Sequence, residues 1–167
     1  APIGYNPVPE MTFSLAAGLN WKGIDFSILL QGAARSSIYL QQDIAWDNFW
    51  GNYYEEHIGR WTPETAATAT YPRFTKAATP AHPNYYKSDY WLKDSKYLRL
   101  KNIQLGYTIP RKLLKKFGVR SLRVYANAYN LFTWDNVKKV DPESSNNSNG
   151  QFYPQQKVIN FGINLNF

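Results

Sequence analysis

The strongest constraint in this sequence is a strict alternation of apolar and polar residues. Between Met11 and Trp21 every odd position is apolar, and every even position is polar or small. Successive side chains of a β-strand point to opposite faces, so this spacing predicts a strand with one apolar and one polar face.

Four further segments repeat the alternation, and together they predict an antiparallel all-β fold. They begin at Ile24, near Lys96, at Leu122 and at Ile159. The last is the most regular, because large apolar residues alternate with Asn or Gly without exception as far as Phe167.

Alternation fits either a soluble β-sandwich or a transmembrane β-barrel. In a sandwich the apolar face packs on a second sheet, whereas in a barrel it contacts lipid. Three features favour the barrel. The segments run to about ten residues, as a tilted membrane strand requires. The polar faces carry Asn, Gln, Ser and Gly, and aromatic residues end the apolar faces at Trp21, Tyr107 and Phe167.

The connections are short at 22–23, long at 32–95, short at 110–120 and long at 132–156. Membrane barrels alternate in this way between short periplasmic turns and long extracellular loops. We therefore predict a multi-pass protein of the bacterial outer membrane whose C-terminus is periplasmic.

Five strands leave two open edges, which hydrocarbon does not tolerate. We therefore expect residues 1–167 to be the C-terminal part of one β-barrel domain, with the earlier strands before Ala1. The opening APIGYNPVPE carries no export signal, which agrees with this expectation.

The third segment breaks the alternation in its first half. Arg99 and Lys101 share a side with Ile103, whereas Leu98 and Leu100 oppose them. We interpret this half as projecting beyond the bilayer, where the constraint lapses. The side chains expected to face lipid are Phe13, Leu15, Phe26, Ile28, Ile103, Leu105, Val124, Phe161, Ile163 and Leu165.

The composition argues against several other functions. The net charge of +7 suggests nucleic acid, but the basic residues form small groups instead of a continuous stripe, so no nucleic acid is expected. The chain has no cysteine, and His57 and His82 lack ligand spacing, so no metal or cofactor is expected. No nucleophile elbow, phosphate loop or triad order is present, and we expect no enzyme.

The short connection PRKLLKKFG, residues 110–118, predicts one or two helical turns, with proline at the first turn and glycine after the last. Its cations fit either a lipid-binding patch or a solvated periplasmic turn. The solvated turn is the favoured interpretation.

Short blocks spread over nearly the whole chain resemble one known family. They are YLRLKNIQLGYTIP (97–110), SLRVYANAYNLFTW (121–134), VDPE (140–143) and FGINLNF (161–167). KGIDFSILLQG (22–32), RWTPE (60–64) and YPR (71–73) fit the preceding segments in the same order. The family is the SusC/RagA group of TonB-dependent outer-membrane transporters of Bacteroidetes-type bacteria.

This resemblance implies a barrel of about 22 strands filled by an N-terminal plug. It also implies a SusD-like surface lipoprotein as a lid, oligosaccharide or peptide substrates, and energy delivered by the TonB complex. The plug and the TonB contact have no counterpart in these residues. The terminal aromatic Phe167 resembles the signal that the barrel assembly machinery reads.

The long connection 32–95 is the expected functional surface, because flat Trp and Tyr rings stack on sugars and suit protein interfaces. Three alternatives remain open: packing of the loop on itself and the barrel rim, contact with the lipoprotein lid, and contact with substrate. The candidate contact residues are Trp46, Trp50, Tyr53, Tyr54, Trp61, Tyr85, Tyr86 and Trp91.

Two rival functions accompany the importer hypothesis. One is a secreted, aromatic-rich carbohydrate-binding β-sandwich, which would be soluble. The other is a passive porin, which shares the barrel but has neither a lid nor a link to TonB.

Overall fold

The computed structural model describes residues 3–42, 45–47, 51, 53–76, 81–138, 140–144 and 155–167. The chain divides into two compact units. We call Pro9–Arg35, Lys96–Asn136 and Pro154–Phe167 the sheet unit, and Ala1–Val8, Ser36–Ser95 and Val137–Tyr153 the loop module.

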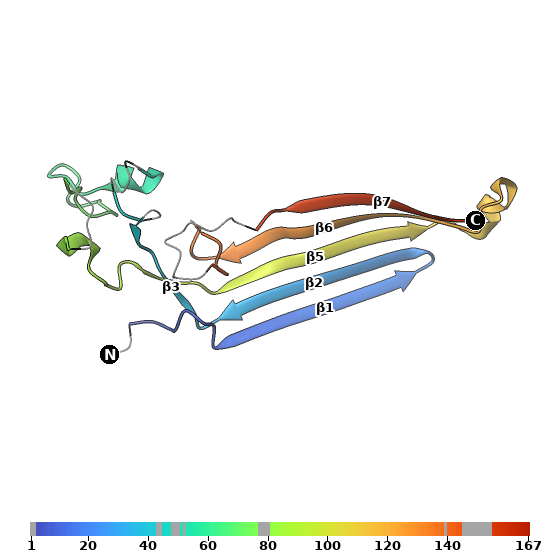
Figure 1. The fold of residues 1–167 in the computed structure, drawn as a ribbon, viewed down its shortest axis with the longest axis horizontal. Helices are drawn as coiled ribbons and strands as arrows, with labels where there is room; N and C mark the ends of the chain where they lie inside the picture. The colour runs from blue at the N-terminus through green and yellow to red at the C-terminus, as the bar shows by residue number, and fades with distance from the viewer. Residues whose placement is uncertain are drawn as a thin grey trace. The chain divides into compact units, whose positions relative to one another are not determined.

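The sheet unit is one five-stranded antiparallel sheet with the order β1-β2-β5-β6-β7 (Figure 1). Its strands are β1 (Met11–Trp21), β2 (Ile24–Ala34), β5 (Tyr97–Thr108), β6 (Ser121–Asp135) and β7 (Val158–Asn166). The antiparallel β-fold expected from the alternation is therefore confirmed. β2 and β6 run further than the sequence pattern indicated, so the long connections begin after Ala34 and Asp135.

The hairpin between β1 and β2 is as tight as a hairpin loop can be. Lys22 and Gly23 both have positive φ, 46° and 89°, which is the backbone of a type I′ turn. A side chain at Gly23 would also approach the Thr108 carbonyl oxygen to 2.7 Å. Glycine is therefore required there both for its conformation and for its lack of a Cβ.

The register brings the apolar residues of all five strands onto one face. One row across the sheet runs Trp21, Ile24, Tyr107, Val124 and Ile163, each directly opposite the next. Directly opposed residues in antiparallel strands have their side chains on the same side. The apolar surface is therefore continuous from β1 to β7.

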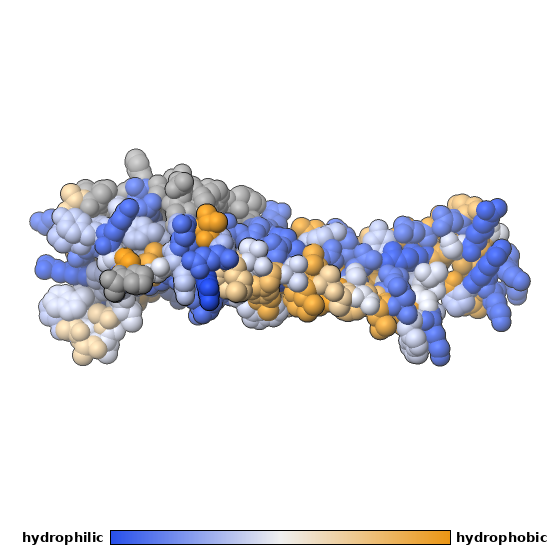
Figure 2. Space-filling model, turned by 90° about the horizontal axis from the view of Figure 1, so that it is seen from below, coloured by the Kyte–Doolittle hydropathy of each residue, from blue (hydrophilic) through white to orange (hydrophobic). Residues whose placement is uncertain are grey.

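Many of the large side chains on this apolar face are exposed. Phe161 is 83% exposed, Ile163 69% and Leu15 62%. Apolar residues follow the length of the strands in Figure 2. A soluble sandwich would bury these side chains against a second sheet.

The break in alternation within β5 has a different cause from the one that the sequence suggested. Leu30 pairs with Leu100 while Leu29 pairs with Asn102, so Lys101 is an extra residue in β5. On the other side of β5, Asn130 has a φ of 50°, which suits an asparagine at an irregular position.

The β-bulge at Lys101 shifts the phase of the alternation by one residue. Leu98 and Leu100 therefore return to the apolar face, opposite Trp134 and Phe132. Arg99 faces Thr133 on the polar side, where its Nε donates to Thr133 Oγ1 at 3.0 Å. The expectation that Arg99 shares the apolar face of Ile103 was wrong, because a single-residue bulge inverts the pattern.

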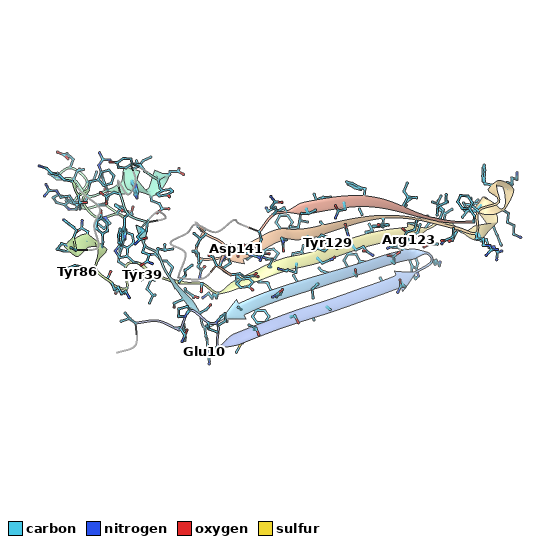
Figure 3. All side chains as sticks on the ribbon, in the orientation of Figure 1. Glu10, Tyr39, Tyr86, Arg123, Tyr129 and Asp141 are labelled. Atoms are coloured by element: carbon cyan, nitrogen blue, oxygen red, sulfur yellow. The ribbon has the colours of Figure 1, made fainter. Side chains whose placement is uncertain are left out.

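The polar face carries an ion pair that spans three strands. Arg123 of β6 reaches over β5 to Asp25 of β2, with Nε–Oδ1 at 2.9 Å and Nη2–Oδ2 at 2.5 Å (Figure 3). Gly106 lies beneath the pair, and a Cβ there would come within 2.5 Å of both partners. This charged pair therefore lies on the face opposite Ile163.

The connection between β5 and β6 forms the helical turn expected from its sequence. It consists of α1 (Arg111–Leu114) and the 3-10 turn η4 (Lys115–Phe117), and it ends at Gly118 with φ 68°. In the described residues, no helix has the length and apolar content needed to cross a membrane.

The register predicts that adding a methyl group at Gly32 lowers the stability of the sheet. Gly32 lies opposite Phe13, and a Cβ there would meet the Phe13 ring and stand 2.7 Å from the Tyr97 carbonyl oxygen. Because a backbone oxygen cannot move aside, we expect Gly32→Ala to lower the free energy of unfolding by about 1–3 kcal/mol. Urea unfolding of the full-length protein measures it.

Gly18→Ala is the matched control, because its Cβ would have no neighbour closer than 3.5 Å. This substitution should leave stability unchanged or raise it by up to about 1 kcal/mol. Equal losses for the two alanines would contradict the assigned register.

Candidate functional site

The loop module is a folded body. Near the two ends of its longest segment, Ser36–Ser95, the strand β3 (Ser37–Tyr39) pairs antiparallel with β4 (Leu92–Asp94). Next to this pair, the Ser95 amide donates to the Ser36 carbonyl oxygen at 3.0 Å, and their hydroxyls are 2.9 Å apart. Two 3-10 turns, η2 (Glu55–Gly59) and η3 (Pro83–Tyr85), lie between the strands in sequence.

Aromatic side chains form half of the module's buried core. Trp46 packs on Tyr85 with ring centroids 4.7 Å apart, and Tyr71 meets Trp91 edge to face at 5.9 Å. Rings pack with specific geometry and bury large areas, so a few of them can organise a short segment that is otherwise polar. The buried cluster is Ile38, Leu40, Ala45, Trp46, Tyr71, Tyr85, Trp91 and Val137.

A buried carboxylate lies within this core. Asp47 is 1% exposed, and its Oδ2 accepts the Thr75 backbone N–H at 3.0 Å. Its Oδ1 accepts a hydrogen bond from the Tyr85 hydroxyl and lies 3.4 Å from the Tyr71 hydroxyl, which donates to the Ala45 carbonyl oxygen at 2.8 Å. The bonds of Asp47 join segments up to 38 residues apart.

The tyrosines around Asp47 stay protonated and act as donors. Burial raises the pKa of Tyr71 and of Tyr85 well above the ordinary value, and the nearby Asp47 charge raises both further. A hydroxyl that keeps its proton can satisfy a buried carboxylate oxygen, which would otherwise be costly to desolvate.

His57 is a structural residue of the same core. It is 2% exposed; its Nδ1 accepts the Tyr54 backbone N–H at 3.0 Å, and its Nε2 lies 3.3 Å from the Ala45 carbonyl oxygen. Both ring nitrogens are therefore engaged, with the proton on Nε2. Within the described ranges, no group of three or more His, Cys, Asp or Glu residues could hold a metal ion.

The candidate contact residues fall into three groups. Trp46, Tyr85 and Trp91 are each 3% exposed, so their rings pack the module, as the self-packing alternative states. Trp50 lies outside the described residues. The remaining rings are at least partly exposed: Tyr53 57%, Tyr54 38%, Trp61 39% and Tyr86 57% (Tyr86 is marked in Figure 3).

Cations lie close to the partly exposed rings of the module. Tyr53 is 5.6 Å from Phe74, and the Arg60 guanidinium lies over the Phe74 ring at 5.0 Å. Lys93 lies 5.1 Å over the ring of Tyr90, whose hydroxyl donates to the Thr70 carbonyl oxygen. Such a surface offers ring faces for stacking together with hydrogen-bond donors, which suits binding.

Sequence reasoning did not single out Asp47. A lone aspartate carries no spacing pattern, and its importance depends on tyrosines far away in the sequence. The only available signal was its position beside Trp46 in an aromatic-rich segment.

The comparisons with curated proteins all lead to one class. The chain is 29% identical over 181 residues to the TonB-dependent receptor P26 of Formosa agariphila, an alignment covering 97% of this chain and 17% of that protein. It is 25% identical over 163 residues to the TonB-dependent receptor SusC of Bacteroides thetaiotaomicron, covering 96% and 15%. No protein-family profile matches the chain.

The solved structures agree in fold. The RagAB peptide importer in its open-open state superposes with a TM-score of 0.74 at 24% identity, covering 98% of this chain and 18% of that one. Its closed-closed state gives a TM-score of 0.72 at 24% identity.

An exposed apolar sheet face and a folded aromatic loop module are therefore found in a chain related to outer-membrane receptors. More specifically, the chain is homologous to TonB-dependent receptors, SusC among them, which confirms the resemblance seen in its motifs. It spans 17% of the length of the first of these relatives. The relatives are receptors and not enzymes, in agreement with the expectation for this chain.

The network around Asp47 predicts a specific loss of order in the loop module. Asp47→Ala removes the acceptor of the Thr75 amide and the bond from the Tyr85 hydroxyl to the carboxylate, while Thr75 Oγ1 stays 3.1 Å from that hydroxyl. A buried donor left without an acceptor costs about 1–3 kcal/mol. We expect faster hydrogen exchange and faster proteolysis within 36–95 of the full-length protein.

Asp89→Ala is the control, because Asp89 is exposed. It should leave both rates unchanged. If Asp47→Ala behaved like Asp89→Ala, the carboxylate would not hold the module together.

Proposed function

We propose that this chain is the C-terminal part of a TonB-dependent outer-membrane importer, and that its sheet is a segment of a closed barrel of about 22 strands. The observation that carries the proposal is the continuous, exposed apolar face that runs in register across all five strands. The homology to SusC-type receptors supports it.

The distribution of charge on the sheet supports lipid contact by the apolar face. Arg123 and Asp25 lie on the opposite face, which would line the barrel interior. A charge in hydrocarbon is costly, whereas a charge inside a barrel is paired or hydrated. The side chains expected to face lipid all belong to the apolar face: Phe13, Leu15, Phe26, Ile28, Ile103, Leu105, Val124, Phe161, Ile163 and Leu165.

The edges of the sheet support closure by further strands. Within the described residues β1 pairs only with β2, and β7 only with β6. In lipid, the free backbone groups of β1 and β7 need partners, which strands from the rest of the protein would supply.

In this proposal the loop module faces the cell exterior and Phe167 lies on the periplasmic side, where the barrel assembly machinery reads it. Tyr53, Tyr54, Trp61 and Tyr86 then contact a SusD-like lipoprotein or an oligosaccharide or peptide substrate. The TonB complex acts through parts of the protein outside these residues.

The assigned faces predict unequal effects of arginine along β7. Ile163→Arg places a charge on the lipid side, so we expect it to destabilise the barrel, by up to roughly 2–4 kcal/mol at the bilayer midplane and by less toward the interface. Reversible folding of the full-length protein into vesicles measures the difference.

Asn160→Arg is the appropriate control, because Asn160 lies on the polar face opposite Asn127. Asn164 is less suitable, since it lies opposite Arg123 and an arginine there would add repulsion between like charges. Equal costs at 160 and 163 would refute the assignment of the lipid face.

Transport itself is tested in cells that depend on the full-length protein for uptake. Collapse of the inner-membrane proton gradient should stop uptake if TonB drives it. Persisting uptake would identify a passive porin instead. A soluble protein recovered outside the outer membrane would favour the carbohydrate-binding sandwich.

The exposed rings of the module are tested by the double variant Tyr53→Ala/Tyr86→Ala. Loss of a co-purifying lipoprotein identifies these rings as partner contacts, and loss of uptake with the lipoprotein retained identifies substrate contacts. Tyr5→Ala, at a ring 50% exposed in the same unit, is the control and should change neither. If the double variant also changes neither, the two rings contact neither ligand nor partner.

A further inference from the structure

The helical turn between β5 and β6 exposes large apolar side chains. Leu113 is 65% exposed and Phe117 75%, whereas Leu114 between them is buried. Leu113 lies in α1 and Phe117 in η4, so each of the two successive turns exposes one large apolar side chain. Exposing two large apolar side chains to water is unfavourable, so a turn that is only solvated would not be expected to carry them.

Cations surround this apolar pair. Residues 110–120 contain no acidic residue, and every basic side chain among them is exposed: Arg111, Lys112, Lys115, Lys116 and Arg120. None of the ion pairs of the described chain involves them. The turn therefore combines apolar anchors with uncompensated positive charge, as in segments that bind anionic membrane surfaces.

The turn is also continuous with the apolar face of the sheet. It follows Tyr107 and precedes Leu122, both of which lie on that face. At the same end of the sheet, Lys22 lies 4.9 Å over the ring of Trp21. Aromatic and basic residues gather where a membrane protein leaves the hydrocarbon and meets the headgroups.

We propose that Pro110–Arg120 docks on an anionic phospholipid surface, with Leu113 and Phe117 inserted at the level of the acyl boundary and the lysines and arginines on the phosphates. This proposal rests on the proposed function, since it needs the sheet to cross a bilayer. It reverses the preference for a solvated turn, because the sequence pattern did not show that Leu113 and Phe117 are exposed while Leu114 is buried.

The test uses the full-length protein in vesicles of phosphatidylcholine, with and without phosphatidylglycerol. A nitroxide attached through Phe117→Cys, in a background free of other cysteines, reports collisions with dissolved oxygen, which concentrates in lipid, and with a water-soluble nickel chelate. We expect phosphatidylglycerol to shift the collisions from chelate to oxygen, and high salt to reverse the shift.

Charge-matched variants identify the lysines responsible. Lys115→Gln/Lys116→Gln should abolish the shift caused by phosphatidylglycerol. Lys76→Gln/Lys87→Gln removes the same charge from exposed positions of the loop module and should preserve it. Equal collisions with the chelate in both lipids would overturn the proposal, and this is the result expected of a turn that binds an anionic polymer of the cell wall instead. A shift that is unchanged in Lys115→Gln/Lys116→Gln would also overturn it.

A second label separates this proposal from the one it rests on. A nitroxide attached through Ile163→Cys should meet oxygen in both lipids if the sheet faces hydrocarbon. Oxygen contact at 163 with chelate contact at 117 rejects only the docking of the turn. Chelate contact at both positions rejects the membrane assignment of the sheet as well.

Discussion

Directly opposed side chains in the four pairings of the sheet lie on the same face, so the register at each pairing determines where every side chain of the next strand points. A slip of one residue would move a whole apolar set to the polar side. The tight turn at Lys22 and Gly23 fixes the first pairing, because a two-residue loop with two positive φ angles admits one geometry. The separation of apolar from charged residues depends on these registers.

The sheet was predictable because its signal is local. Period-two alternation can be read within one strand, and the family-like motifs added the order of the segments. The phase of β5 was not predictable in the same way. The bulge at Lys101 is defined by which residues of β2 and β6 face it, and alternation within β5 alone gave the wrong face for Arg99. A break in an alternating strand is therefore ambiguous until its neighbours are known.

The loop module shows the opposite situation. The sequence showed that the module is rich in aromatic residues, but it did not show which rings are buried. Trp46, Tyr85 and Trp91 pack inside, whereas Tyr53 and Tyr86 remain exposed. The distinction depends on contacts between distant segments, such as the bond from Tyr85 to Asp47 across 38 residues. Composition therefore located the candidate surface, and only tertiary packing reduced it to particular side chains.

Apolar and charged side chains are arranged differently on the strands and at the turn after β5. On the strands, apolar residues and charges occupy opposite faces, so the ion pair of Asp25 and Arg123 avoids the side on which Ile163 lies. At the turn after β5, Leu113 and Phe117 lie among cations instead. A surface with apolar residues and charges on opposite faces suits hydrocarbon, where a charge has no partner. A surface on which they are mixed suits the headgroup layer, where lysines bind phosphates and apolar side chains contact acyl chains. The change from separation to mixing along β5 therefore indicates where the chain would leave the hydrocarbon.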